Sequence, residues 1–328
     1  MRLIYIDCLK GFLIILVIIG HIIQMNDVDF TNNIIYRYIY STHMPLFFVV
    51  SGFLSYKERL FLKDLKKRVF QLLLPFFTWW FLHWLFESKL DFFYSLINLI
   101  KNPDYGLWFL WVLFFCILLL HLVDRVSDYL KFRKEIVTFI SAILLYMVYI
   151  MTNFRLLGFQ FIAWFFMFYC LGFYLRKFQI VFFSKINFLL LMSLILFPIS
   201  AWFSVIKGNP LFYAYYDFGL LFSYVYKFIV AILGSILAFT LLNKIVKIFD
   251  DQFWIVRALV KLGKMTLGIY AIHFTFLPII QLNRTQIPIE LISIIILAFT
   301  IIISFVSILL IRKNKILALF LLGERKIE

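Results

Sequence analysis

The chain has 328 residues, of which 64% are hydrophobic and 21% aromatic, and its formal net charge is +15. Because an ordinary soluble domain is only about 45–50% apolar, this composition excludes an aqueous globular protein and predicts a polytopic membrane protein. The basic residues cluster in short segments between apolar runs, which favours cytoplasmic loops and argues against a nucleic-acid partner.

Ten apolar segments follow one another along the chain, each near the length of about 20 residues that a helix needs to cross about 30 Å of hydrocarbon. We therefore predict an all-α, polytopic transmembrane helical bundle of about ten spans. It would form a single integral-membrane domain over residues 1–328, with no appended soluble domain. The predicted spans are residues 4–25, 38–56, 69–88, 106–123, 136–152, 159–175, 186–206, 218–242, 265–282 and 289–311.

The connections between these spans add two expectations. The longest connections, residues 89–105 and 243–264, leave room for short interfacial helices. The first apolar run has no small-residue cleavage site after it, so we expect it to remain as a spanning helix. The three cysteines, Cys8, Cys116 and Cys170, lie far apart within or beside apolar runs. They are expected to pack in the core, with no disulfide framework and no metal site.

The distribution of basic residues predicts the orientation. If the N-terminus lies in the cytoplasm, 25 of the 32 lysine and arginine residues fall in cytoplasmic segments and six fall outside. Lys227 is the remaining one and lies within the eighth span. Since cytoplasmic loops carry the excess of lysine and arginine, both termini are expected in the cytoplasm.

The first span carries three ionisable residues, Asp7, Lys10 and His21. His21 follows Lys10 by eleven residues, which is ~16 Å of helix and close to three turns, so the two side chains point in a similar direction. Asp7 could simply cap the helix and Lys10 could extend its amine to the membrane surface. A histidine deep in a membrane usually faces protein or water, which favours a functional role for His21.

The second span contains YSTHMPLFFVVSGFL, with His43 near its outer boundary. A short loop joins the first two spans, so we expect them to be antiparallel neighbours with His21 and His43 at similar depth. The two histidines could then act on one reacting group. His43 could equally cap the second helix.

Four motifs resemble the integral-membrane acyltransferase 3 family. The pattern D-x-L-K-G followed by apolar residues and G-H is similar to the start of the family's first helix, with Lys10 where many members have arginine. The run from His43 to Phe53 resembles its second-helix signature. GLWFLWVLF, from Gly106 to Phe114, is similar to its mid-chain segment, and LGKMTLGIYAIHF, which contains Tyr270 and His273, resembles its penultimate helix. Within the family, the chain looks most like the fucose 4-O-acetylase and polysaccharide O-acyltransferase branch.

The resemblance implies transfer of an acyl group, expected to be acetyl, from cytoplasmic acyl-CoA to a hydroxyl of a cell-surface or exported polysaccharide or its lipid-linked precursor. His21 would be the general base, with His43 as the second catalytic histidine. Lys10, beside Asp7, would hold the phosphates of the donor. Acyl-CoA (acetyl-CoA expected) would be a substrate and not a resident cofactor. The partners would be the donor, the glycan or lipid-linked acceptor and membrane lipid, in the cell membrane of a bacterium.

Further residues are candidates for binding substrate or the oxyanion of the tetrahedral intermediate. They are Trp108, Tyr270 and His273, with His43 also able to take this part. Lys227 would bind a carboxylate or phosphate if it faces the bundle interior. It could also extend its amine to the membrane surface, or mark a misplaced span boundary.

A polysaccharide exporter or lipid-linked sugar flippase, without acyl transfer, is the alternative function. In such a protein, embedded charges line a pathway through repeated and broken helices. The absence of a visible internal repeat, with only 12 glycines and 7 prolines, argues against it. A structural or sensory membrane protein would explain the spans but not four polar motifs in this order.

Overall fold

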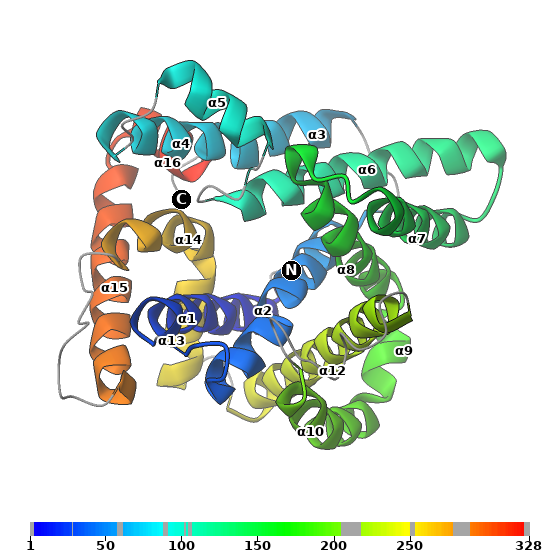
Figure 1. Ribbon diagram of the computed structural model, residues 1–328. Coiled ribbons are helices and arrows are strands. Elements are labelled where there is room, and N and C mark those ends of the chain that lie inside the picture. The colour runs from blue at the N-terminus through cyan, green and yellow to red at the C-terminus, as the bar shows by residue number, and fades with distance from the viewer. Residues whose placement is uncertain are drawn as a thin grey trace. The chain divides into compact units, whose positions relative to one another are not determined.

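A computed structural model describes residues 3–27, 29–57, 62–87, 91–101, 103, 107–204, 218–249, 253–277 and 289–324. All regular elements within these ranges are helices (Figure 1). The chain forms two compact units. Unit 1 comprises Met1–Phe47 and Phe178–Phe305, and unit 2 comprises Phe48–Lys177 and Val306–Glu328.

Unit 1 contains the N-terminal helix and most of the last third of the chain. Its helices are α1 (Ile4–Asn26), the first part of α2 (Ile34–Ser55), α9 (Gln179–Ser184), α10 (Ile186–Trp202), α12 (Phe218–Phe249), α13 (Trp254–Lys264), α14 (Thr266–Phe276) and most of α15 (Ile289–Arg312).

Unit 2 contains the rest of α2, the middle of the chain and the C-terminal helix. Its further elements are α3 (Leu62–Arg68), the π-helical η1 (Val69–Leu73), α4 (Leu74–Glu87), α5 (Phe92–Lys101), α6 (Trp108–Leu130), α7 (Lys134–Thr152), the 3₁₀ turn η2 (Leu156–Gly158), α8 (Phe159–Lys177) and α16 (Lys315–Leu322).

The described part of the chain has eight helical stretches that are long and apolar enough to cross a membrane. The predicted all-α polytopic fold is therefore confirmed. Two predicted spans differ from these eight. The second corresponds to α2, which is long enough but carries Arg37, His43 and Pro45. The ninth corresponds to α14, which is an apolar helix of 11 residues. The two long connections do contain short helices, α5 and α13.

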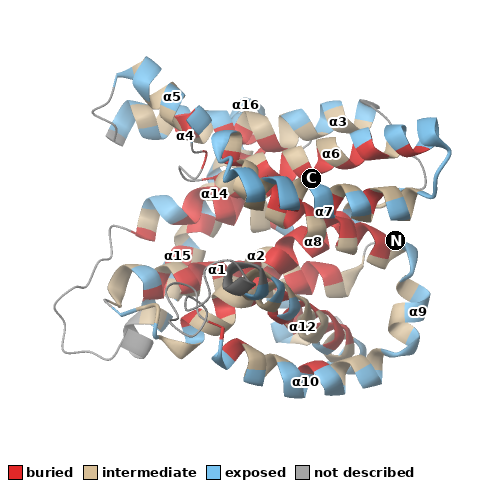
Figure 2. Cartoon of the chain, turned by 45° about the vertical axis from the view of Figure 1, so that its right-hand side comes forward, coloured by how far each residue is buried: buried red, intermediate tan, exposed pale blue. Residues whose placement is uncertain are grey.

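Within unit 1, the side chains of α1 are largely buried, whereas those of α10 are largely exposed. On α1, Leu9, Leu13, Ile14 and Ile18 are fully buried, so this helix forms the core of the unit. In contrast, α10 presents mostly exposed or half-buried residues, most of them apolar (Figure 2). Exposed apolar side chains of this kind are suited to contact with lipid, because a spanning helix satisfies its own backbone hydrogen bonds.

The closest helix crossing in unit 1 brings the backbones of α1 and α13 together at two glycines. A Cβ atom on Gly11 would lie 2.0 Å from the carbonyl oxygen of Leu259, and one on Gly263 would lie 1.8 Å from the carbonyl oxygen of Asp7. No side chain fits at either point, so only glycine permits this approach. Small residues at a crossing allow such backbone contact between helices in membranes.

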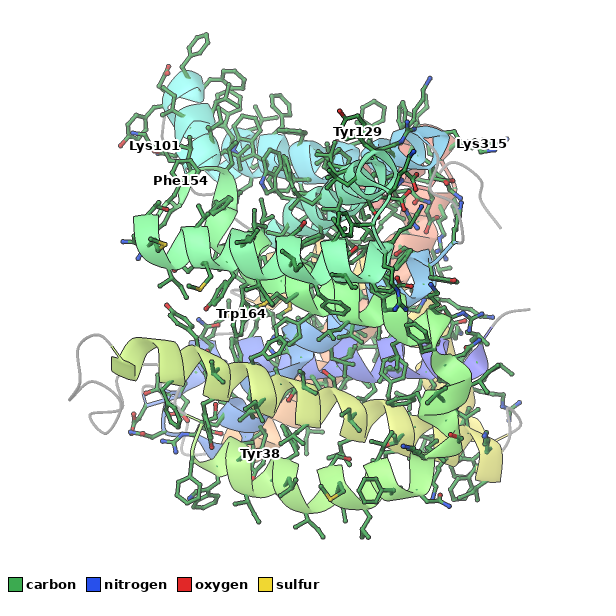
Figure 3. The ribbon with its side chains drawn as sticks, turned by 90° about the vertical axis from the view of Figure 1, so that its right-hand side faces the viewer. Tyr38, Lys101, Tyr129, Phe154, Trp164 and Lys315 are labelled. Carbon is green, nitrogen blue, oxygen red and sulfur yellow. The ribbon has the colours of Figure 1, made fainter. Side chains whose placement is uncertain are left out.

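The first half of α2 is held in unit 1 by contacts with three helices. A Cβ on Gly20 of α1 would lie 2.9 Å from the ring of Tyr40. A Cβ on Gly234 of α12 would meet the hydroxyl of Thr42 at 2.2 Å. Tyr38, labelled in Figure 3, donates a hydrogen bond of 3.0 Å to the carbonyl of Pro198 on α10.

Unit 2 uses the same kind of close contact. A Cβ on Gly52 of α2 would lie 2.0 Å from the carbonyl oxygen of Tyr169 on α8, and one on Gly172 would lie 1.9 Å from that of Val49. At the far end of the sequence, the indole nitrogen of Trp79 on α4 donates a 2.9 Å hydrogen bond to the carbonyl of Leu321 on α16. These contacts tie three separate parts of the chain into one unit.

Replacing Gly263 by leucine should destabilise unit 1, because the new side chain must displace backbone at Asp7. Overpacking a helix contact costs about 3 kcal/mol when the neighbour cannot move. We expect a lower yield of monodisperse protein and a lower unfolding temperature in detergent. Ala258→Leu is the matched control, since it adds bulk to an exposed position of the same helix. Equal stability of the two variants would contradict the packing described here.

Candidate active site

Two histidines from distant parts of the chain meet in unit 1. The ring of His21 on α1 lies 5.5 Å from the ring of His273 on α14, measured between centroids. Phe274 presents its ring edge-on to His21 at 5.3 Å. His21 is half-buried, whereas His273 is only 2% exposed. His21 is therefore the member of the pair that an incoming molecule can reach.

His43 on α2 is linked to the His21 side of α1 through Tyr40, whose hydroxyl donates a 2.9 Å hydrogen bond to Oε1 of Gln24. The ring of His43 lies 4.7 Å from the ring of Tyr40, and Tyr40 stacks on Tyr36 at 3.9 Å. His43 itself is 4% exposed. The structure thus brings together three of the predicted site residues, His21, His43 and His273.

Backbone carbonyls fix the tautomers of the two deeply buried histidines. The Nδ1 atom of His43 lies 2.7 Å from the carbonyl oxygen of Ile39, and that of His273 lies 2.8 Å from the carbonyl oxygen of Tyr270. Because a carbonyl can only accept, each Nδ1 carries the proton and donates it. In the neutral rings, Nε2 then keeps a free lone pair. The Nε2 atom of His273 has no hydrogen-bond partner among the described residues.

His21 has a different neighbour, which the sequence analysis missed. This neighbour is Gln24 on α1, whose Oε1 accepts a 2.9 Å hydrogen bond from the hydroxyl of Tyr40. Gln24 follows His21 by three residues and so lies on the same helix face. That spacing was the available signal, but a glutamine near the end of a span resembles an ordinary interfacial residue.

This arrangement suits proton transfer at His21. Three imidazoles in one cluster disfavour the presence of more than one positive charge, because like charges repel strongly in a medium of low dielectric constant. A neutral His21 can accept a proton. The free lone pairs on His43 and His273 can then stabilise the imidazolium that forms.

Asp7 and Lys10 lie near the beginning of α1 and form an ion pair. The Nζ atom of Lys10 lies 2.8 Å from Oδ1 of Asp7, and the Asp7 side chain is 7% exposed. The carboxylate therefore neutralises most of the charge that the lysine would offer to a ligand. The pair lies beside the α13 crossing, because the backbone of Asp7 contacts Gly263.

The remaining predicted residues are Tyr270, Lys227 and Trp108, and only Tyr270 is shown beside the histidines. Tyr270 is 8% exposed, and its ring lies 5.7 Å from that of His273, so it belongs to the cluster. Lys227 is half-buried on α12 and forms no ion pair within the described ranges. Trp108 belongs to unit 2, where it stacks on Phe161 at 5.1 Å. Gly106, the first residue of the Trp108 motif, lies outside the described residues.

Comparison with protein families matches residues 3–312 to the acyltransferase 3 family, described as "Acyltransferase domain". This range includes all members of the histidine cluster. The chain belongs to the acyltransferase 3 family. The family predicted from the four motifs is thereby confirmed, and its acyltransferase domain lies in a chain with several membrane-spanning helices.

Two curated relatives are both called nodulation protein NolL. The protein from Mesorhizobium japonicum is 33% identical over 129 residues, which is 36% of this chain and 35% of the relative. The protein from Sinorhizobium fredii is 34% identical over 119 residues, which is 32% of each chain. The matched stretch thus spans about a third of the length of these relatives. No solved structure matches the chain.

Substitution of Gln24 by leucine should slow acyl transfer by the acyltransferase without unfolding it. The substitution removes the acceptor of the Tyr40 hydroxyl beside His21, and losing one hydrogen bond at the site is worth about 1.4 kcal/mol, which is about tenfold in rate. Gln24→Glu keeps an acceptor for Tyr40 and should retain more activity than Gln24→Leu. Turnover should be measured at saturating substrates, beside the unfolding temperature. Equal turnover in Gln24→Leu and the parent protein would remove Gln24 from the site.

Proposed function

We propose that this acyltransferase moves an acyl group, expected to be acetyl, from acyl-CoA to a hydroxyl of a cell-surface or exported glycan or its lipid-linked precursor. The observation that carries the proposal is the histidine cluster, in which half-buried His21 lies beside two buried histidines with fixed tautomers. Acyl transfer from a thioester to a hydroxyl needs a general base of this kind.

In the proposed reaction, the acceptor oxygen attacks the thioester carbonyl carbon while His21 takes the hydroxyl proton. The C–S bond then breaks, and the proton on His21 passes to the CoA sulfur as the thiol leaves. The lone pairs on His43 and His273 stabilise the transient charge on His21. A donor for the oxyanion is also needed, and the Gln24 amide is the nearest neutral candidate on the same helix face as His21.

The donor is proposed to approach from the end of α1 that carries Asp7 and Lys10. His21 lies eleven residues beyond Lys10, or ~16 Å of helix, which is of the order of the length of the pantetheine arm of CoA. With both termini in the cytoplasm, this end of α1 would face the cytosolic pool of acyl-CoA. The Lys10–Asp7 pair would then line the entrance, and the acceptor would meet the thioester near His21.

The proposed acceptor class rests on the family branch that the motifs resemble, the fucose 4-O-acetylases and polysaccharide O-acyltransferases. Both curated relatives come from bacteria, which supports placement in a bacterial cell membrane. Half-buried Tyr40, which stacks on buried Tyr36, offers part of its ring near His43 as a surface on which a sugar could pack.

His21→Ala should abolish acyl transfer while the protein still inserts and accumulates. Loss of a general base typically lowers the rate about 100- to 10,000-fold. The measurement is thiol release from acetyl-CoA together with mass analysis of envelope glycans from cells that carry the variant. His83→Ala, at an exposed position of α4, is the control. Near-normal acylation by well-folded His21→Ala would rule out the proposed base.

The proposed orientation predicts which positions a membrane-impermeant thiol reagent can label in intact cells. Cysteines at Lys67, Lys131 and Lys313 should resist labelling, because basic residues favour the cytoplasmic side. Cysteines at Asn32 and Arg155 should react. All five positions are exposed, and the native cysteines are buried. The reverse pattern would place the Lys10 end of α1 away from cytosolic CoA.

A further inference from the structure

One face of α13 carries three exposed cations. Arg257, Lys261 and Lys264 follow one another at intervals of four and three residues, which places them within an arc of about 60° on a helix with about 100° per residue. The opposite face holds Val256 and Gly263, which are buried. We call the three cations the basic face of α13.

The charge of the basic face is not neutralised within the described part of the chain. Arg257 and Lys264 form no ion pair there, and the amine of Lys261 lies 4.5 Å from the ring centroid of Phe305, which leaves its charge intact. Lys10, in contrast, is already paired with Asp7. Beside this end of α1, α13 therefore supplies the cations that remain free to bind an anion.

Two ordinary roles account for only part of this pattern. Lys261 and Lys264 lie in the last turn of α13, where positive charge interacts favourably with the helix dipole. Arg257 lies in the first turn, where a cation gains nothing from the dipole. A membrane-surface helix explains exposed Trp254, which lies beside Lys261 at the edge of the basic face, and exposed Ile255, which projects from the other side of α13. Contact with lipid headgroups is therefore the competing role of the basic face, and the experiment below separates it from phosphate binding.

We propose that the basic face of α13 binds the phosphate groups of the acyl-CoA donor. CoA carries a diphosphate and a 3′-phosphate at the end opposite its thioester, and guanidinium and ammonium groups form charge-assisted hydrogen bonds with phosphate oxygens. The inference rests on the proposed acyl-CoA donor. It assigns the phosphate groups of that donor to cations on α13, and not to the polar residues of the motifs on α1 and α2.

The position of α13 along α1 agrees with the length of the donor. Leu259 contacts Gly11, and ten further residues of α1 lead to His21, a distance of ~15 Å along the helix. The crossing of α13 with α1 thus lies about one pantetheine arm from the histidine cluster along α1, and the basic face lies on the side of α13 that is turned away from this crossing. Because α14 begins directly after Met265, the same segment also carries His273 to that cluster.

The test compares ligands that do or do not carry phosphate, with the full-length protein in phosphatidylcholine nanodiscs. Binding of acetyl-CoA, 3′-dephospho-CoA and pantetheine is measured by calorimetry for the parent protein and for Arg257→Gln/Lys261→Gln/Lys264→Gln. The matched control is Lys131→Gln/Lys313→Gln/Lys315→Gln, which removes the same charge from exposed positions of unit 2 (Lys315 is labelled in Figure 3).

We expect the α13 variant to bind acetyl-CoA at least about tenfold more weakly, a loss of about 1.4 kcal/mol, with unchanged affinity for pantetheine. The control should bind acetyl-CoA normally, and Lys261→Arg/Lys264→Arg should retain affinity. Raising the salt concentration should weaken the parent protein's binding of acetyl-CoA towards that of the variant.

Other outcomes separate this inference from the proposed function. If the α13 variant binds acetyl-CoA as the parent does, the inference is wrong and the proposed donor stands. If the variant binds acetyl-CoA normally but is less stable than the parent in phosphatidylglycerol nanodiscs, the basic face binds lipid headgroups and the inference is again wrong. If the folded parent protein binds neither acetyl-CoA nor pantetheine, the proposed donor itself fails.

Discussion

The contact between the backbones of α1 and α13 determines how the site in unit 1 is built. Gly11 and Gly263 allow the two helices to touch without intervening side chains, which fixes α13 against the first turns of α1. Met265 alone separates α13 from α14. The position of α14, and with it His273, therefore follows from a crossing that involves no catalytic side chain.

The two buried histidines, His43 and His273, are tolerated in apolar surroundings because carbonyl groups of their own helices accept the hydrogen bonds that their Nδ1 atoms donate. Ile39 and Tyr270 offer carbonyl oxygens that the preceding turn of each helix places within reach of Nδ1. Such a bond removes the cost of an unsatisfied buried donor and leaves the ring neutral. The protein thereby holds two imidazoles near His21 without a buried carboxylate, whose charge would be costly at this depth.

Local patterns in the sequence predicted the spans, the helical connections and the spacing of Lys10 and His21, since all of these depend on helix period and hydropathy. The same patterns placed the second span at residues 38–56, whereas α2 begins at Ile34 and so includes Arg37 as well as His43, which makes this helix less apolar than the eight spans. A spacing of three residues also allows the ion pair of Asp7 with Lys10, although the sequence suggested a separate structural role for each residue.

The parts of the site that escaped prediction depend on contacts between distant segments. His273 reaches His21 only because α13 is docked on α1, and no local pattern encodes that docking. Tyr40 and Gln24 meet across two helices, and each looks like an ordinary interfacial residue in its own segment. The roles of Lys227 and Trp108 stay predictions: Lys227 is half-buried on α12, and Trp108 stacks on Phe161 within unit 2.

The bond between Trp79 and Leu321 joins residues 242 positions apart in the sequence. During synthesis, α4 enters the membrane long before α16 has been made, so its partner face must wait beside lipid or a chaperone. The contact of α4 with α16 can form only after α16 has left the ribosome. A ribosome that stalls after α15 would leave a chain in which the indole of Trp79 lacks its acceptor on α16, which gives quality control a defined surface by which to recognise unfinished protein.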